Sequence, residues 1–432
     1  MLNKTILKQA LLLFFSPIFF VVGVLFAIVA QLKNLKNYKA RLVWGSTPLI
    51  NNRHWSKAMS IAGFESETFT YPFYGSINQR SDWGRLLDES WSWCPTLVRP
   101  FFAFLEALIK YDVFFISADG FFIGTLPFIW RFQFPLFRLA GKKVVFLPYG
   151  GDSYVYRRIR STPLLHGLLL SYPKSSRRQL SVQARLDYWC KHSDACIPGV
   201  TGMDGFGRWD VILASALSLD LSEWKASDRK SPANGRNGTV FICHAPNHQG
   251  FKGTEFIVDA VQQLKSEKLQ VELILLEKIQ NSQVQQVMQS KVDILVEQLI
   301  VTGHGLNGLE GLASGLPVVS NLEDDSYILP MRRWSYFSEC PIVSASPESL
   351  VDVLRKLVTN PELRIQLGSA GRKYAEKYHG LDSAAYLFNE VIEYVYGRRD
   401  SLMNLYHPLL GIYPRRLPLI EHPLVNNRIV GE

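Results

Sequence analysis

A lysine lies between two glycines just ahead of a predicted helix. The stretch HAPNHQGFKGTEFIVDAVQQL, residues 244–264, follows a short apolar strand at 239–243 and contains Lys252. A glycine-rich turn before a helix presents free backbone N–H groups, and the helix dipole favours an anion at that end. Lys252 adds a full positive charge, so the stretch predicts a phosphate or diphosphate site. A solvated loop lysine is an equally open interpretation, because one lysine is a weak signal and the P-loop pattern is absent.

Three glycines and a glutamate form a second candidate site. The stretch VTGHGLNGLEGLASGLPVVS, residues 301–320, has Gly303, Gly305 and Gly308 ahead of Glu310. Glycines let the backbone approach a ligand closely. A carboxylate early in the following helix can accept hydrogen bonds from ribose hydroxyls, as acidic residues do in dinucleotide-binding folds. The alternative is a glutamate that only interacts favourably with the helix dipole.

An aspartate marks a third candidate site. In LPYGGDSYVY, residues 147–156, a predicted strand ends in two glycines and Asp152. Ligands of doubly wound sheets bind at the carboxyl ends of strands, which favours a functional role. Asp152 is also the single acid among residues 131–185, which carry eleven lysines and arginines. Charge pairing is therefore an equally open interpretation.

Sequence patterns that bind metals are missing. The chain has no HExxH, Asp-x-Asp or CxxC pattern, its nine histidines are dispersed, and its five cysteines are scattered. We therefore expect no metal site and no disulfide framework, and the cysteine usage favours a reducing compartment.

Alternating strands and helices must position the three candidates. The 432 residues suggest two or three domains, and short apolar runs alternate with helical patterns in both halves. A polar, glycine- and proline-containing stretch separates the halves and predicts a linker. The predicted class is α/β, with two Rossmann-like doubly wound domains that face a cleft. The predicted boundaries are a membrane anchor at 1–39, an acceptor domain at 40–222, a linker at 223–238, a donor domain at 239–398 and a tail at 399–432.

The amino-terminal segment is long and apolar. Residues 9–32 contain no charge over 24 positions, which is long enough to cross a bilayer as a helix. Basic residues on both flanks favour a catalytic body on the cytoplasmic face of the plasma membrane. Ser16-Pro17 interrupts the run, so both a single span and a re-entrant hairpin remain open. A buried core helix is the third interpretation.

Basic residues gather in two segments. Residues 1–41 carry a net charge of +6 and residues 131–185 a net charge of +10, whereas the whole chain carries +9. No zinc-finger, homeodomain or RNP-like pattern accompanies them, so we expect no nucleic-acid partner. The pattern favours attraction to the anionic lipids of a membrane surface.

Taken together, these stretches resemble a known family. The second half resembles the donor domain of a GT-B glycosyltransferase of the bacterial family 4-like group, also called glycosyl transferases group 1. The matching stretches are 244–264, 292–320 and SPESLVDVLRKLVTNPELRIQLGSAGRKYAEKYH at 346–379. The resemblance covers 236–398 well and 40–225 more weakly.

The resemblance implies roles for particular residues. Lys252 would contact the diphosphate of a nucleotide-sugar donor, Glu310 its ribose, and the glycine loop would let the donor approach. The implied catalytic residues are Lys252 together with Asp152 on the acceptor side. The implied donor-binding residues are His248, Lys252, Gly253, Gln298, Gly303, Gly305, Gly308 and Glu310. Such enzymes stabilise the leaving diphosphate with cations and helix ends, so the nucleotide sugar is a co-substrate and no cofactor is expected.

Two departures from the family pattern affect the sugar side of the site. Family members often carry a Glu-x7-Glu pattern, whereas this chain has Thr302 at the first glutamate position. The basic residue that often precedes the lysine is replaced by residues 247–249, Asn-His-Gln. Retaining stereochemistry is therefore an open expectation.

The predicted function is transfer of a sugar to a lipid-linked saccharide during surface polysaccharide synthesis, at a membrane reached through residues 9–32. Two alternatives remain. One is a GT-B-fold nucleotide-sugar 2-epimerase, and the other is a non-catalytic nucleotide-sugar-binding subunit.

Overall fold

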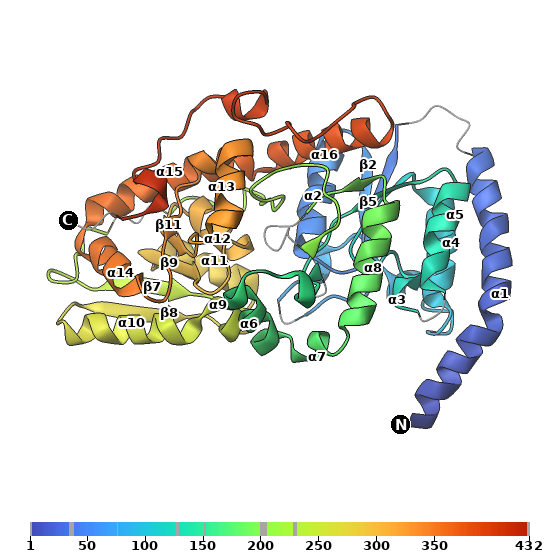
Figure 1. Cartoon of the computed structure of the whole chain (residues 1–432), viewed down its shortest axis with the longest axis horizontal. Coiled ribbons are helices and arrows are strands. Elements are labelled where there is room, and N and C mark those ends of the chain that lie inside the picture. Colours follow the sequence, from blue (N-terminus) through green and yellow to red (C-terminus); the bar gives the residue numbers. More distant parts are fainter. Residues whose placement is uncertain are drawn as a thin grey trace.

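Two parallel β-sheets organise the chain (Figure 1). The computed structural model describes residues 2–33, 39–75, 77–126, 129–150, 153–198, 205–227 and 231–429. The first sheet has the order β3-β2-β1-β4-β5-β6. Its strands are β1 (Arg41–Trp44), β2 (Glu65–Thr70), β3 (Arg85–Leu86), β4 (Val113–Ile116), β5 (Lys143–Phe146) and β6 (Ala195–Cys196). This is the strand order of a Rossmann fold.

The second sheet has the order β11-β10-β9-β7-β8. Its strands are β7 (Val240–His244), β8 (Val271–Leu275), β9 (Ile294–Gln298), β10 (Val318–Ser320) and β11 (Val343–Ser344). Numbered within its own domain, this sheet has the other common doubly wound order, in which the first strand lies between the second and third. Strands such as β4 and β9 are buried along their whole length, as expected for parallel strands covered on both faces. The predicted α/β class with two doubly wound domains is therefore confirmed.

Helices cover both faces of each sheet (Figure 1). The helices of the first half are α1 (Leu2–Lys33), α2 (Ile50–Ile61), α3 (Leu87–Ser90), α4 (Arg99–Lys110), α5 (Gln133–Leu139), α6 (Thr162–Ser171), α7 (Pro173–Ser176) and α8 (Gln179–His192). In the second half they are α9 (Gln249–Lys252), α10 (Thr254–Ser266), α11 (Asn281–Ser290), α12 (Leu306–Ala313), α13 (Asp325–Trp334), α14 (Leu350–Thr359), α15 (Pro361–Tyr378) and α16 (Leu381–Val395). The predicted domain boundaries stay predictions, and residues 228–230 of the predicted linker lie outside the described residues.

The last long helix returns to the first domain. Helix α16 packs on α2, although it follows the second sheet in the chain (Figure 1). The ring of Phe388 lies 4.8 Å from Trp44 and 5.5 Å from Trp55, centroid to centroid. These side chains belong to one apolar cluster that draws residues from both halves of the chain. Two Rossmann-like domains with this return crossing form the GT-B architecture.

Helix α1 runs unbroken through Pro17, so the re-entrant hairpin considered from the sequence is wrong. Proline has no N–H to donate to the carbonyl four residues earlier, which here is that of Leu13. The hydroxyl of Ser16 donates to the Leu13 carbonyl at 2.8 Å instead. A neighbouring side chain thus satisfies the group that Pro17 leaves free, and the helix continues.

One face of α1 packs on the first domain. Helix α1 contacts α4 and α5, and the rings of Phe19 and Phe101 lie 4.4 Å apart. Ala27 and Ala30 are fully buried. The segment Ala10–Lys33 has a mean hydropathy of 2.8 and could cross a membrane by length and composition. Its other face exposes Phe14, Ile18, Val21, Leu25, Phe26, Ile28, Val29 and Leu32.

Candidate functional site

The chain positions Lys252 at the carboxyl edge of the second sheet. After β7, the single turn α9 ends at Lys252, and Gly253 follows with a φ of 73° that favours glycine. A Cβ on Gly253 would lie 3.1 Å from Cγ1 of Ile300, so space also restricts this position. The Leu299 N–H donates to the Lys252 carbonyl at 3.0 Å. The end of β9 therefore holds the backbone of the lysine turn.

The ammonium group of Lys252 is hydrogen-bonded to two protein side chains. It donates to a carboxylate oxygen of Glu297 and to Oε1 of Gln298 at 2.8 Å. The Lys252 side chain is 15% exposed, which leaves one side open to a ligand. The interpretation of Lys252 as a solvated loop residue is thus wrong, and its role in binding the donor stays a prediction.

Glu297 is a site residue that the sequence analysis missed. Its side chain is fully buried on β9, and both carboxylate oxygens lie 3.1 Å from the backbone nitrogen of Gly305. The hydroxyl of Ser320 adds a longer contact at 3.4 Å. One buried carboxylate therefore joins Lys252 to the amino end of α12. A charged residue inside a strand that is buried on both faces was the available signal.

The predicted loop glycines surround this carboxylate. Gly303 has a φ of 103°, and its carbonyl accepts from Nε2 of Gln298 at 3.1 Å. Gly305 directly precedes α12, and a Cβ on Gly308 would lie 3.5 Å from Cγ of Glu297. Gln298, predicted to contact the donor, is buried and bridges Lys252 to the loop. The loop thus closes over Glu297.

Glu310 is buried on α12 with neutral hydrogen-bond partners. Nδ2 of Asn281 donates to Oε1 at 2.8 Å, and Nδ2 of Asn307 donates to Oε2 at 3.1 Å. Burial raises the pKa of Glu310 to about 7, the two amides oppose that rise, and the Glu297 charge adds to it. The carboxyl of Glu310 therefore titrates near neutral pH.

Tyr149 connects the first domain to Glu310. It follows β5 and keeps 39% of its surface exposed, yet burial raises its pKa and the Glu310 charge raises it further. The influence of the Glu310 charge indicates that the Tyr149 side chain lies near Glu310 of α12. Asp152, the predicted acceptor-side residue, lies with Gly151 outside the described residues.

The lysine turn also touches the first domain. The Phe251 N–H donates to the hydroxyl of Ser171, at the end of α6, at 3.0 Å. The His248 ring lies 4.6 Å from the ring of Tyr172. Burial and then the Lys252 charge lower the pKa of His248. His248, predicted to bind the donor, thus lies at the contact between the two domains.

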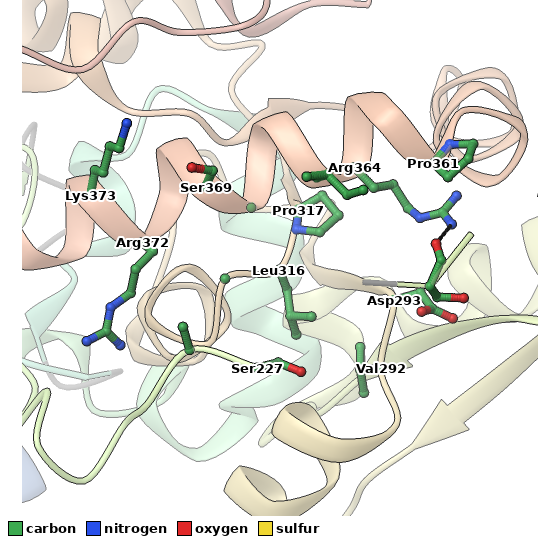
Figure 2. Close-up of a pocket in the computed structure, with 15 residues that line it drawn as sticks. Ser227, Val292, Asp293, Leu316, Pro317, Pro361, Arg364, Ser369, Arg372 and Lys373 are labelled. Carbon is green, nitrogen blue, oxygen red and sulfur yellow. Dashed lines mark hydrogen bonds between the residues drawn. The ribbon is translucent and has the colours of Figure 1, made fainter. Parts of the chain in front are cut away.

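A separate cavity of about 360 Å³ lies at the opposite edge of the second sheet (Figure 2). Asp293 and Pro317, which line it, directly precede β9 and β10. The guanidinium of Arg364 donates to the Ser231 carbonyl at 3.1 Å and to the Ala233 carbonyl at 2.6 Å. Arg364 therefore fixes the backbone of the segment that precedes β7. The cavity is therefore distinct from the Lys252 site. Within the described ranges, no group of three histidine, cysteine or acidic residues could hold a metal.

Comparisons with known proteins find matches among solved structures. No family model and no curated protein matches the chain. An α-glucosyltransferase in complex with UDP and a 13-mer DNA is 10% identical with a TM-score of 0.48, over 83% of this chain and 100% of that one. A glycosyltransferase from Rickettsia africae is 10% identical with a TM-score of 0.45, over 84% and 100%. The wall teichoic acid polymerase TagF is 9% identical with a TM-score of 0.42, over 92% and 99%.

These neighbours are distant in sequence and only partly superimpose. The likeness carries no argument about substrate or chemistry. The GT-B assignment therefore stands on this chain's own features, which are the two strand orders and the return of α16 to α2.

Proposed function

We propose that the chain is a glycosyltransferase that moves a sugar from a nucleotide-sugar donor to a lipid-linked saccharide. The observation that carries the proposal is the convergence of Lys252, the Gly305 N–H and Glu310 at one carboxyl edge. That edge is where doubly wound sheets bind nucleotides. Tyr149 of the other domain lies near Glu310, where an acceptor would approach.

In the proposed reaction, the protein stabilises a leaving nucleoside diphosphate. The Lys252 ammonium and the Gly305 N–H donate to the diphosphate as its negative charge grows, which lowers the barrier without a metal. Glu310 accepts hydrogen bonds from the ribose hydroxyls. Asp152 acts on the acceptor side, and transfer of a hexosyl group with retention remains part of the proposal.

The proposed acceptor lies at the cytoplasmic face of a membrane. The exposed apolar face of α1 suits the interior of a bilayer, and a separate group of exposed basic residues suits anionic headgroups. On and around α6 and α7, the exposed basic residues are Arg157, Arg160, Lys174, Arg177 and Arg178. A membrane-bound enzyme of this kind would build a surface polysaccharide from lipid-linked precursors.

A second candidate function is a non-catalytic nucleotide-sugar-binding subunit. Two observations favour it. Glu297 already occupies Lys252 and the Gly305 N–H. Thr302, at the position of the missing family glutamate, donates to Asn321 at 3.3 Å.

One experiment separates these functions. Membranes that contain the protein are incubated with radiolabelled nucleotide sugars, and the lipid extract and the free donor are then analysed. Transfer of label to lipid supports the proposed function. Epimerised free donor would identify a 2-epimerase, and bound but unchanged donor would identify the binding subunit. Membranes with the Lys252→Ala variant serve as the control.

A further inference from the structure

A buried carboxylate occupies the donors that a phosphate would need. Glu297 accepts from the Lys252 ammonium and from the Gly305 N–H, and its side chain is fully buried. These two donors come from different elements, α9 and the start of α12. An ionised carboxylate offers charged oxygen acceptors of the same kind as those of a phosphate. Glu297 therefore already accepts from donors that could hold a phosphate.

The surroundings limit how this carboxylate can be replaced. Ser320 Oγ is closer to the Gly303 carbonyl, at 2.5 Å, than to Glu297, at 3.4 Å. His304 is 1% exposed. Burial lowers the pKa of His304, so it supplies no permanent charge here. Lys252, which already contacts Glu297, is thus a cation for which an incoming diphosphate would compete.

We propose that Glu297 sets the affinity of the site for the donor by competing with its diphosphate for Lys252 and the Gly305 N–H. The inference rests on the proposed donor site. An incoming diphosphate takes over part of both contacts and also meets the repulsion of a buried negative charge. After transfer, the carboxylate regains both donors, which weakens the hold on the nucleoside diphosphate product. Glu297 thus tunes release as well as binding.

The test is binding of nucleoside diphosphates to the full-length Glu297→Gln variant. Glutamine keeps an oxygen acceptor for Lys252 but removes the charge. Isothermal titration calorimetry with a panel of ADP, GDP, CDP and UDP should show the preferred diphosphate binding about tenfold tighter than to the wild-type protein. The matching nucleoside without phosphates should bind both proteins equally.

A matched control removes the same charge from the same sheet edge. Glu277 follows β8 and accepts from Gln249 rather than from Lys252. Glu277→Gln should leave diphosphate affinity within about twofold of wild type, because a charge outside the contact is screened by water. An equal gain in both variants would overturn the inference, since it would report net charge alone.

A second variant, Glu297→Asp, keeps the proposal testable if Glu297→Gln does not fold. Glu297→Asp keeps the charge but shortens the side chain by one methylene, so it cannot reach both donors as closely. It should bind the diphosphate more tightly than wild type and less tightly than Glu297→Gln. Unchanged or weaker diphosphate binding in a folded variant would refute the competition. If the wild-type protein binds none of the four diphosphates, the proposed function itself fails.

Discussion

Each domain holds a buried ion pair, but at opposite ends of its sheet. In the first domain, Asp112 accepts from Nε of Arg41 at 2.9 Å and from Nζ of Lys142 at 3.1 Å, and these residues directly adjoin the amino ends of β1, β4 and β5. In the second domain, Lys252 and Glu297 meet at the carboxyl ends of β7 and β9. The same kind of ion pair therefore lies at two different ends of a parallel sheet, and doubly wound sheets in general bind ligands at the carboxyl end.

The two pairs also differ in how much of the lysine side chain remains exposed. Burial raises the pKa of Asp112, but hydrogen bonds from Arg41 and the Lys142 charge outweigh it and hold that pKa below its usual range. The Lys142 side chain is fully buried, so no ligand can reach it. Lys252 keeps 15% of its side chain open. The Asp112–Lys142 pair is closed to ligands, whereas the partly open Lys252–Glu297 pair can exchange a partner.

The largest expected effect comes from removing Lys252. Lys252→Ala leaves Glu297 buried without its cation, so stability should fall by about 3–5 kcal/mol at neutral pH. Turnover should also fall by about 10²-fold or more, because a donor to the leaving group is lost. Urea unfolding and transfer kinetics measure the two effects.

A double variant separates stability from chemistry. In Lys252→Ala/Glu297→Gln the unpaired charge is gone, so most of the stability should return while turnover stays low. Recovery of turnover along with stability would mean that Lys252 has only a structural role.

The next effect concerns Glu310 and pH. The carboxyl titrates near an ordinary pKa of 4.5 when unfolded and near 7 when folded. A raised folded pKa stabilises the protein below pH 4.5, and this contribution is lost as pH rises to about 7. Glu310→Gln should therefore gain up to about 3 kcal/mol over wild type at pH 8, and the gain should shrink towards pH 4.5.

The same residue should control donor binding. The ionised carboxylate accepts two ribose hydroxyls, so the donor KM of the wild-type enzyme should fall as pH rises through about 7, whereas that of Glu310→Gln should stay flat. Parallel pH profiles for the two proteins would contradict the ribose assignment. Unfolding curves and initial rates across pH 5–9 test both statements.

A smaller effect is expected at the closed pair. Lys142→Met keeps the volume of the side chain and leaves Arg41 on Asp112, so it should destabilise by about 1–3 kcal/mol. Affinity for nucleoside diphosphates should not change, since the pair lies at the other end of its sheet. Thermal unfolding and calorimetry check the two outcomes. A loss of diphosphate affinity in the folded variant would contradict the statement that the Asp112 pair has no part in ligand binding.

The smallest expected effect tests how α1 sits on the first domain. Ala27 is fully buried, whereas Val29 is 44% exposed on the same helix. Ala27→Leu should overpack the contact with α4 and α5 and cost about 1–2 kcal/mol, whereas Val29→Leu should be silent. Thermal unfolding in detergent measures both. Equal stability of the two variants would show that α1 is detached from the domain.

Much of the second domain could be predicted from the sequence. Its strands, helices and glycine loop follow from local periodicity and turn residues, and Lys252 was identified by its place between a strand and a helix. Glu297 was missed because, in the sequence, it is one residue of a short apolar run and resembles a strand position. Its partners are 45 residues earlier and 8 residues later in the chain, so only folding shows that they converge.

The amino-terminal helix also has some properties that the sequence predicts and others that only the folded structure decides. Its length and apolar character are sequence properties, because they depend on composition alone. Whether Pro17 breaks the helix depends on whether another donor reaches the Leu13 carbonyl, and the Ser16 hydroxyl does so. Which face of α1 meets protein is set by α4 and α5, whose packing surface exists only in the folded domain.

The sequence by itself determined the α/β class, the two-domain order and the residue types at the glycine loop, because these depend on contacts between near neighbours in the chain. The tertiary structure alone decided that Glu297 pairs with Lys252, that Tyr149 lies within reach of Glu310, and that α16 returns to the first domain. These outcomes depend on contacts between residues far apart in the chain. Burial then sets the energies of the charged groups, since a charge removed from water must find a partner or change its pKa.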